Sequence, residues 1–327
     1  MGLRPLALFL CLKFTVLKNF STQVTRPGTF YLNSNWLINC FVFTNKIITI
    51  KAMNKLITFL ALALTSVSLS FSALAADEQT CKVDTEKLLW TKADYAITGD
   101  TLVINRQRVR LAGLYAPQLE KKQKWHTPGE PLAKEAQIFL NKLLANNDLE
   151  VGIEFDTTRL DNRNRQLVHL FLRDGTSVQQ KMLESGYTLA RTTYNNLKHA
   201  ECYYQAEQKA RSGEYQLWDF MAKNPDRHFP LANSSKLTSE DEGFRIIKGK
   251  IVKVDKSSSN YILNMDTTGI RVQKKYWKNF DYNQLKKLDG KTIEVRGYAY
   301  LYKGAMYMML DHPYAIDALN PTSQTSK

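Results

Sequence analysis

The sequence predicts a mainly β protein of two small domains, the first of which also carries helices. Short alternating apolar and polar segments, bounded by Gly, Asn and Asp turns, occur over residues 92–114 and again over 244–310. Between them, apolar residues recur at helical spacing over 131–145 and 177–212. The length of 327 residues suits about two domains, and 44% hydrophobic with 23% charged residues excludes a wholly disordered chain.

The first domain is expected to start with strands and to end with helices. Its first three strands are short and separated by polar turns: 95–97, 101–104 and 109–114. A helix over 131–145 follows a loop that contains Pro and Gly, and its apolar residues fall on one face. Two further strands and two further helices complete the domain: 149–155, 166–172, 177–185 and 197–212.

The second domain is expected to be all β. Residues 221–242 predict a linker, because they hold two Pro, several Ser and Asn, and an acidic run. Strands then resume at 244–254, 261–265, 270–275, 292–300 and 305–310. The pairs Gly290-Lys291 and Lys303-Gly304 are typical of hairpin turns. We expect a β domain over 243–318, followed by a disordered tail at 319–327.

The first 75 residues differ from the rest, since they hold seven basic residues and no acidic one. From Met53 the pattern is that of a secretory signal peptide, with a positive start, an apolar run and small residues at 73–75. We expect 53–75 to be this signal peptide and 1–52 to be a start-site artefact or disordered. The alternative is an uncleaved anchor, because 56–75 is nearly long enough to span a bilayer. Cleavage predicts a periplasmic or secreted protein without a membrane segment.

Cleavage after residue 75 would leave two of the four cysteines, Cys81 and Cys202. Two cysteines in an exported protein most simply form one disulfide. Such a bond would join the mature N-terminus to a later helix. Two free thiols are the alternative.

Five motifs between residues 99 and 218 carry a family resemblance. They are Gly99-Asp100-Thr101, the run Val-Arg-Leu-Ala-Gly-Leu-Tyr-Ala-Pro at 109–117, and the segments 129–136, 161–168 and 217–218. In their order and spacing they make residues 76–220 resemble the staphylococcal nuclease (thermonuclease-like) family. The resemblance implies an OB-fold barrel of five strands with three α-helices.

The resemblance also implies roles for individual residues. Arg110 and Arg165 correspond to the two arginines that clamp phosphate in the family, and their planar guanidinium groups suit that contact. Asp100 corresponds to a carboxylate that binds calcium. Phosphodiester hydrolysis needs such cations, a metal and a base that activates water. Without the motifs around them, these arginines would be read as solvated residues of a strand and a turn.

Two positions depart from the family pattern. Tyr115 replaces a metal-binding aspartate, and Gln118 replaces the general-base glutamate. The amide of glutamine cannot accept a proton at neutral pH, so it cannot act as a general base. Loss of a general base costs roughly 10²–10⁴ in rate. Glu120 is a candidate substitute base, and Asp156 and Asp161 are candidates to approach the site.

The function predicted from this pattern is an exported protein that binds phosphate or nucleic acid through a depleted catalytic site. No cofactor is expected; Ca²⁺ would be the metal if the site were active. One alternative is an active metal-dependent phosphodiesterase or endonuclease with relocated carboxylates. Another is a scaffold whose partner is an envelope protein.

The second domain loosely resembles small bacterial OB-like modules in its segment 290–297, and an SH3-like barrel is the alternative. Lys274, Lys275 and Lys278, with Trp277 among them, predict a patch that binds nucleic acid or another polyanion. A solvated face is the alternative. Residues 241–327 hold 15 basic and 9 acidic residues, whereas 76–240 hold 23 and 22. Attraction of a polyanion by net charge would therefore come from the second domain.

Overall fold

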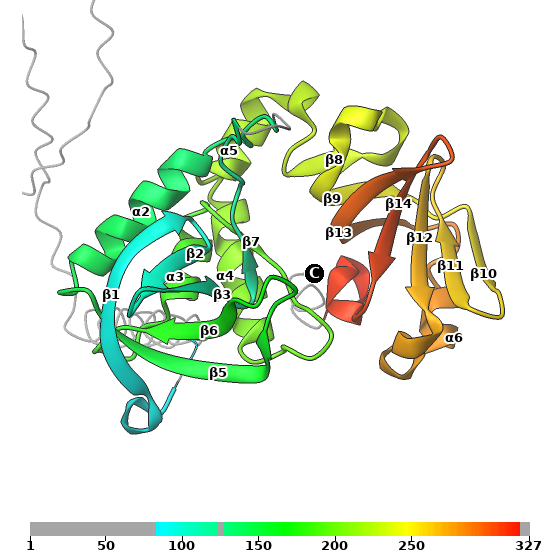
Figure 1. The fold of residues 1–327 in the computed structure, drawn as a ribbon. Coiled ribbons are helices and arrows are strands. Elements are labelled where there is room, and N and C mark those ends of the chain that lie inside the picture. Colours follow the sequence, from blue (N-terminus) through cyan, green and yellow to red (C-terminus); the bar gives the residue numbers. More distant parts are fainter. Residues whose placement is uncertain (1–80, 82, 123–126, 321–327) are drawn as a thin grey trace, which may run out of the picture. The chain divides into compact units, whose positions relative to one another are not determined.

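The structure is a computed structural model that describes residues 81, 83–122 and 127–320 (Figure 1). The predicted signal peptide at 53–75, the segment 1–52 and most of the tail at 319–327 lie outside these residues. Within the described ranges, no helix is both long and apolar enough to cross a membrane.

The first domain is built on a closed barrel of five strands in the order β1-β2-β3-β6-β5 (Figure 1). β3 and β6 pair in parallel, whereas the other neighbours are antiparallel. Inward-facing residues such as Leu102, Val109 and Val168 fill the barrel and are buried. The predicted OB-fold barrel is therefore confirmed. Its strands are β1 (Leu89–Thr98), β2 (Thr101–Ile104), β3 (Gln107–Leu111), β5 (Glu150–Leu160) and β6 (Gln166–Phe171).

Three helices accompany the barrel at the places where they were predicted: α2 (Ala133–Ala145), α3 (Val178–Glu184) and α4 (Ala200–Ser212). The buried face of α2 includes Ala136 and Leu140 and packs on β1. The turn between β1 and β2 comes so close to this helix that a Cβ at Gly99 would lie 2.8 Å from the Cβ of Ala136. Only glycine fits there, and this contact sets the position of the neighbouring Asp100.

A disulfide between Cys81 and Cys202 ties the start of the described chain to α4, with the two Cα atoms 5.5 Å apart. This pairing confirms the predicted bond. Both cysteines are buried, and the backbone N–H of Cys81 donates to Gln180 Oε1 of α3 at 3.0 Å. The bond closes a long loop, since its cysteines are 121 residues apart.

Replacement of both cysteines by alanine is expected to lower the free energy of unfolding by about 2–4 kcal/mol, mainly because the unfolded chain gains freedom. Urea unfolding with and without a reducing agent measures the effect. The reductant should move the unfolding midpoint of the wild type to a lower urea concentration and should leave the midpoint of the double variant unchanged. Protein that begins after residue 75 has only these two cysteines, so two free thiols in that unreduced protein would contradict the bond.

The C-terminal module, residues 243–320, has a sheet in the order β10-β11-β12-β14-β13-β9-β8, in which the short strand β8 (Leu231–Asn233) comes from the segment before the module. β9 leads into β10 after only two residues, so one continuous segment of chain joins the two ends of the sheet. β12 and β14 pair in parallel, as β3 and β6 do in the first barrel, so both domains share the same strand connectivity. The predicted second β domain thus has an OB-like arrangement. Its strands are β9 (Gly243–Lys250), β10 (Lys253–Lys256), β11 (Asn260–Asn264), β12 (Thr268–Gln273), β13 (Thr292–Tyr302) and β14 (Ala305–Leu310), and its helix is α6 (Tyr282–Lys286).

The segment 221–242, expected to be a linker, contributes to both domains. It contains the end of α5 (Leu217–Lys223) and the strand β8 (Leu231–Asn233), which pairs in parallel with β9. The buried Phe229 precedes this strand and joins an apolar cluster with Trp218 and Phe244. This cluster holds residues from both domains and is continuous across them.

Candidate phosphate-binding site

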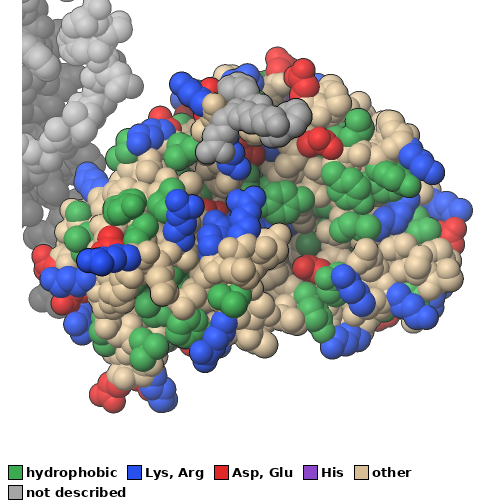
Figure 2. Space-filling model, viewed as in Figure 1, with side chains coloured by type: hydrophobic (Ala, Val, Ile, Leu, Met, Phe, Trp, Pro, Cys, Tyr) green, Lys and Arg blue, Asp and Glu red, His purple; other side chains and the backbone are tan. Residues whose placement is uncertain are grey.

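A cavity of about 560 Å³ lies where the first barrel meets the C-terminal module. Its walls come from β3, from the turn between β5 and β6, and from residues 191–196, which follow β7 (Leu189–Ala190). The module contributes Tyr276, Tyr298 and Asp311. On the face drawn in Figure 2, Lys and Arg side chains gather over the barrel. The cavity itself is lined by four arginines: Arg110, Arg163, Arg165 and Arg191.

Arg110 extends from β3 and is held by the carboxylate of Asp100. Its Nη2 lies 2.9 Å from Asp100 Oδ2, while the hydroxyls of Thr98 and Thr101 donate to Oδ1 at 2.9 and 2.8 Å. Burial lowers the pKa of the Arg110 guanidinium, but Asp100 and the hydroxyl of Tyr298 outweigh burial and raise it. Arg110 is thus a fixed positive charge at the cavity wall.

Arg165 lies at the end of the β5–β6 turn and is held in the same way. Its Nε and Nη2 contact Asp161 Oδ2 at 2.8 and 2.6 Å, and its Nη1 donates to Thr101 Oγ1 at 3.1 Å. Burial would raise the pKa of the Asp161 carboxyl, but hydrogen bonds from Arg165 and Arg163 hold it below its usual value. Thr101 therefore links both predicted phosphate-clamping arginines, and the structure brings them to one cavity.

Arg191 is a third cation that the sequence does not reveal, because it lies in no motif. It follows β7, and its guanidinium carbon lies 4.9 Å from the ring centre of Tyr298. Among the described residues, no carboxylate oxygen lies within 4.0 Å of its side-chain nitrogens. Burial lowers the pKa of the Arg191 guanidinium, and the charge of Arg110 adds to this effect. An anion in the cavity would offset both effects, because it stabilises the charged guanidinium of Arg191.

The residues at 115 and 118 do not line this cavity. Tyr115, in β4 (Leu114–Tyr115), is 1% exposed and donates its hydroxyl hydrogen bond to Glu130 Oε2. The backbone N–H of Gln118 donates to the same oxygen at 2.8 Å. The ring of Tyr115 stacks on Phe244 of the C-terminal module, with centroids 4.4 Å apart.

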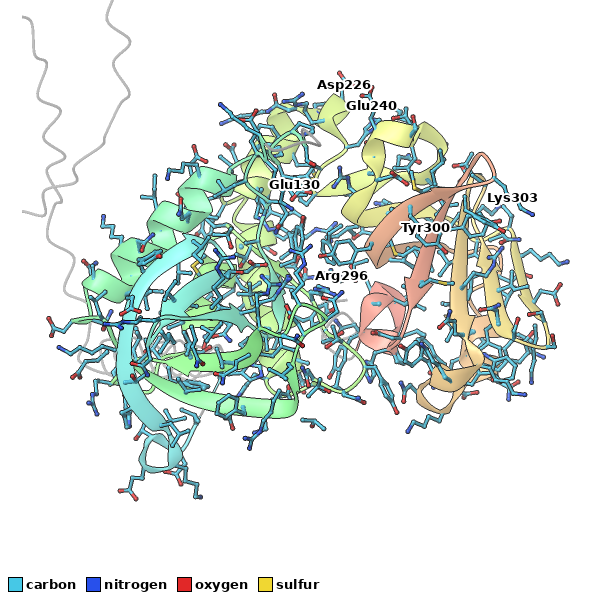
Figure 3. The ribbon with its side chains drawn as sticks, viewed as in Figure 1. Glu130, Asp226, Glu240, Arg296, Tyr300 and Lys303 are labelled. Carbon is cyan, nitrogen blue, oxygen red and sulfur yellow. A yellow bond between two sulfur atoms is a disulfide. The ribbon has the colours of Figure 1, made fainter. Side chains whose placement is uncertain are left out.

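Glu130 is the central residue of this contact, and the sequence analysis did not identify it as one. Besides Tyr115 and Gln118, it contacts Arg245 of the module, whose Nη1 lies 3.3 Å from Oε1. Because the carboxylate of Glu130, which is labelled in Figure 3, contacts three partners, it joins the 115–118 loop to the module. The 115–118 loop is therefore part of a domain contact.

The other candidate carboxylates are also engaged elsewhere. Glu120 is exposed, does not line the cavity, and lies 3.6 Å from Lys122. Asp161 lines the cavity but is bound to Arg165. Asp156 is buried behind the wall, where its Oδ2 lies 3.3 Å from the Nε2 of His169.

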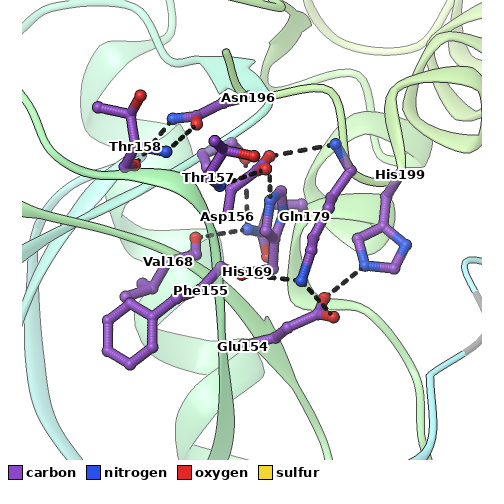
Figure 4. Close-up of polar contacts among 12 residues, drawn as sticks. Glu154, Phe155, Asp156, Thr157, Thr158, Val168, His169, Gln179, Asn196 and His199 are labelled. Atoms are coloured by element: carbon purple, nitrogen blue, oxygen red, sulfur yellow. Dashed lines mark hydrogen bonds and ion pairs between the residues drawn. The ribbon is translucent and has the colours of Figure 1, made fainter.

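A network of polar contacts fixes the wall formed by residues 193–199 (Figure 4). Asn196 accepts from the N–H of Thr158 at 2.8 Å and donates to its carbonyl at 3.1 Å. Asp156 accepts from the N–H of Lys198 at 3.1 Å. Burial would raise the pKa of the Asp156 carboxyl, but the contact with His169 and the hydrogen bonds from the backbone N–H groups of Thr157 and Lys198 together lower that pKa. Asn196 and Thr158 line the cavity, so this network shapes it.

The residues around Asp100 do not fit a calcium ion. Ca²⁺ takes six to eight oxygen ligands, usually with several carboxylates. Both oxygens of Asp100 are already used by Arg110 and the two threonines. Across the described ranges there is no group of three or more His, Cys, Asp or Glu side chains that could hold a metal.

The predicted patch at Lys274, Lys275, Trp277 and Lys278 forms a 3₁₀ turn after β12. Its lysines are exposed, but Trp277 stacks on Tyr261, with centroids 4.3 Å apart, and donates to the carbonyl of Val272. The indole therefore packs within the module rather than facing outward. The same turn places Tyr276 at the cavity.

Comparison with known proteins finds a family match in the first domain. Residues 108–220 match the family described as Staphylococcal nuclease homologue. The chain is 30% identical over 163 residues to the SPbeta prophage-derived endonuclease YokF of Bacillus subtilis (strain 168). The match covers 47% of this chain and 52% of that protein, so the chain spans about half the length of this relative.

Proposed function

Residues 108–220 form a staphylococcal nuclease-like domain, and we propose that its arginine-lined cavity binds phosphate groups of nucleic acid without metal-dependent hydrolysis. The observation that carries the proposal is the convergence of Arg110, Arg165 and Arg191 on one cavity. Guanidinium groups bind phosphate oxygens through two parallel hydrogen bonds. Arg191 has no carboxylate within ion-pair distance in the described ranges, so it is available for such a contact.

The contacts of Tyr115 and Gln118 support the loss of hydrolysis. Hydrolysis of this type needs a metal and a base within hydrogen-bond reach of the attacking water. Tyr115 is buried in a domain contact and Gln118 is an amide that donates to the carbonyl of Ala116. Neither position therefore supplies a carboxylate to the cavity.

A second candidate is an active endonuclease, and it is favoured by the name of the relative YokF. It would require carboxylates from elsewhere in the chain. Export to an oxidising compartment is also part of our proposal. It is supported by the signal-like pattern from Met53 and by the Cys81–Cys202 bond, since disulfides persist mainly in such compartments.

Arg110→Ala is expected to weaken the binding of labelled single-stranded DNA roughly 10-fold or more, because a charge-assisted hydrogen bond contributes about 1.5–3 kcal/mol. Fluorescence anisotropy across a salt series measures it, and the slope of log K against log[salt] should fall by about 0.7 per lost contact. Arg191→Ala should act in the same direction without leaving a carboxylate unpaired.

The matched control is Arg108→Ala, which removes the same charge from an exposed position of the same strand. It should change affinity by less than about 2-fold, as for an exposed charge. Equal weakening by the Arg108 and Arg110 variants would contradict the cavity as the binding site. DNA cleavage that needs Ca²⁺, stops with chelator and disappears in Arg110→Ala would establish the endonuclease instead.

A further inference from the structure

The outer face of β13 continues beyond its contact with the nuclease-like domain. Alternate residues of a strand share one face, and here Arg296 contacts Glu207 at 2.5 Å while the ring of Tyr298 lies under Arg191 and lines the cavity with Arg110. Tyr300 and Tyr302 are the next residues on that face. Figure 3 labels Arg296, Tyr300 and Lys303 along this strand and its turn.

A second hollow of about 260 Å³ lies beside the arginine cavity and is lined in part by this face. It extends to Tyr300 of β13 and Met309 of β14. The two hollows share four lining residues: Arg191, Thr193, Tyr298 and Asp311. The two hollows therefore adjoin each other at these four residues.

The surface beyond the second hollow is aromatic and carries cations. Tyr307 of β14 pairs with Tyr300, with ring centroids 6.2 Å apart, and meets Tyr302 edge to face at 5.7 Å. Arg271 lies over Tyr307 at 5.0 Å, and Lys303 over Tyr302 at 5.5 Å. Tyr298, Tyr302 and Met309 are 45%, 53% and 43% exposed. Exposed aromatic residues that adjoin one another in this way mark an interaction surface.

From this continuity we infer that a single-stranded nucleic acid runs from the arginine cavity over the β13–β14 face and stacks bases on its tyrosines. The inference rests on the proposed function of the cavity. Base stacking on aromatic rings combined with a cationic path is how single strands are bound without sequence preference. A duplex keeps its base faces covered, so the tyrosine row selects a single strand. The module's excess of basic over acidic residues, 15 to 9 over 241–327, favours the same partner.

The test compares oligo(dT) of about 3 and about 12 nucleotides, since site sizes are roughly 4–16 nucleotides per OB fold. The full-length protein and its Tyr300→Ala/Tyr307→Ala variant are measured by anisotropy. The variant should bind the long oligonucleotide at least about 5-fold more weakly for each stacking contact that is lost. Its affinity for the short oligonucleotide should equal that of the wild type. Tyr300→Phe/Tyr307→Phe should restore wild-type affinity, because the rings remain. Tyr95→Ala, at a 57% exposed tyrosine of β1, is the matched control.

A 2-aminopurine placed near the middle of the long oligonucleotide gives a second readout, since stacking on a tyrosine should quench its fluorescence in the wild type only. If the alanine variant binds both lengths like the wild type, the proposed path over the module is wrong, whereas the proposal that the cavity binds phosphate is unaffected. An equal loss for both lengths also overturns the path. If Arg110→Ala and Arg191→Ala leave the binding of both lengths unchanged, the cavity proposal fails, and the path that starts from the cavity fails with it.

Discussion

Arg296→Leu is expected to lower the free energy of unfolding by about 3–5 kcal/mol, the usual effect of removing one partner of a buried ion pair. The guanidinium lies 2.5 Å from Glu207 and 3.1 Å from Asp317, and it also donates to the carbonyl of Ala190 at 3.2 Å. The side chains of Arg296 and Glu207 are 2% and 0% exposed. Without Arg296, Glu207 would remain as a buried charge. Burial already raises the pKa of that carboxyl.

Urea unfolding of the single variants and of Arg296→Leu/Glu207→Leu completes a double-mutant cycle. The double variant should regain most of the lost stability, because well-packed apolar residues often replace a buried ion pair at no cost. Oligonucleotide binding should fall in the single variant, since Tyr298 lies two residues from Arg296 on the same face. A loss below about 1 kcal/mol in Arg296→Leu would show that the pair is solvated.

The sequence identifies the two barrels because their strands alternate and their motifs occur in family order. It identifies Arg110 and Arg165 as a pair for the same reason. It does not reveal β8, since a strand of three residues, Leu231–Asn233, is too short to show a period. It does not reveal the domain contact either. Charged and aromatic residues at alternate positions of β13 have the pattern of a solvated face, but here they meet the nuclease-like domain.

Arg191, Glu130 and Tyr298 were missed for the same physical reason. Each acts through partners that are distant in the chain, and no local spacing encodes those partners. Glu130, for example, meets Arg245 across 115 positions. Tyr115 likewise stacks on Phe244, which belongs to another domain, and no local pattern around residue 115 predicts that contact.

Tyr115→Asp, which restores the family's metal-binding residue type, is expected to cost about 5 kcal/mol of stability or more and to create no nuclease. Loss of a buried aromatic ring costs about 3–5 kcal/mol, and a buried carboxylate adds several more. The new carboxylate would lie beside Glu130, so two negative groups would compete for Arg245. Thermal and urea unfolding, with a cleavage assay in Ca²⁺, measure both outcomes.

Tyr115→Phe is the matched control, because it keeps the ring that stacks on Phe244 and removes only the hydroxyl. Burial raises the pKa of that hydroxyl and Glu130 adds to the effect, so the group is a permanent hydrogen-bond donor. Its loss should cost about 1–3 kcal/mol, the penalty for leaving the Glu130 acceptor unsatisfied. If the aspartate variant were as stable as the phenylalanine variant and gained Ca²⁺-dependent cleavage, the catalytic loop would be intact apart from one side chain. The expected order of stability instead ties residue 115 to the docking of the module, because an aspartate at this position cannot stack on Phe244 as the tyrosine ring does.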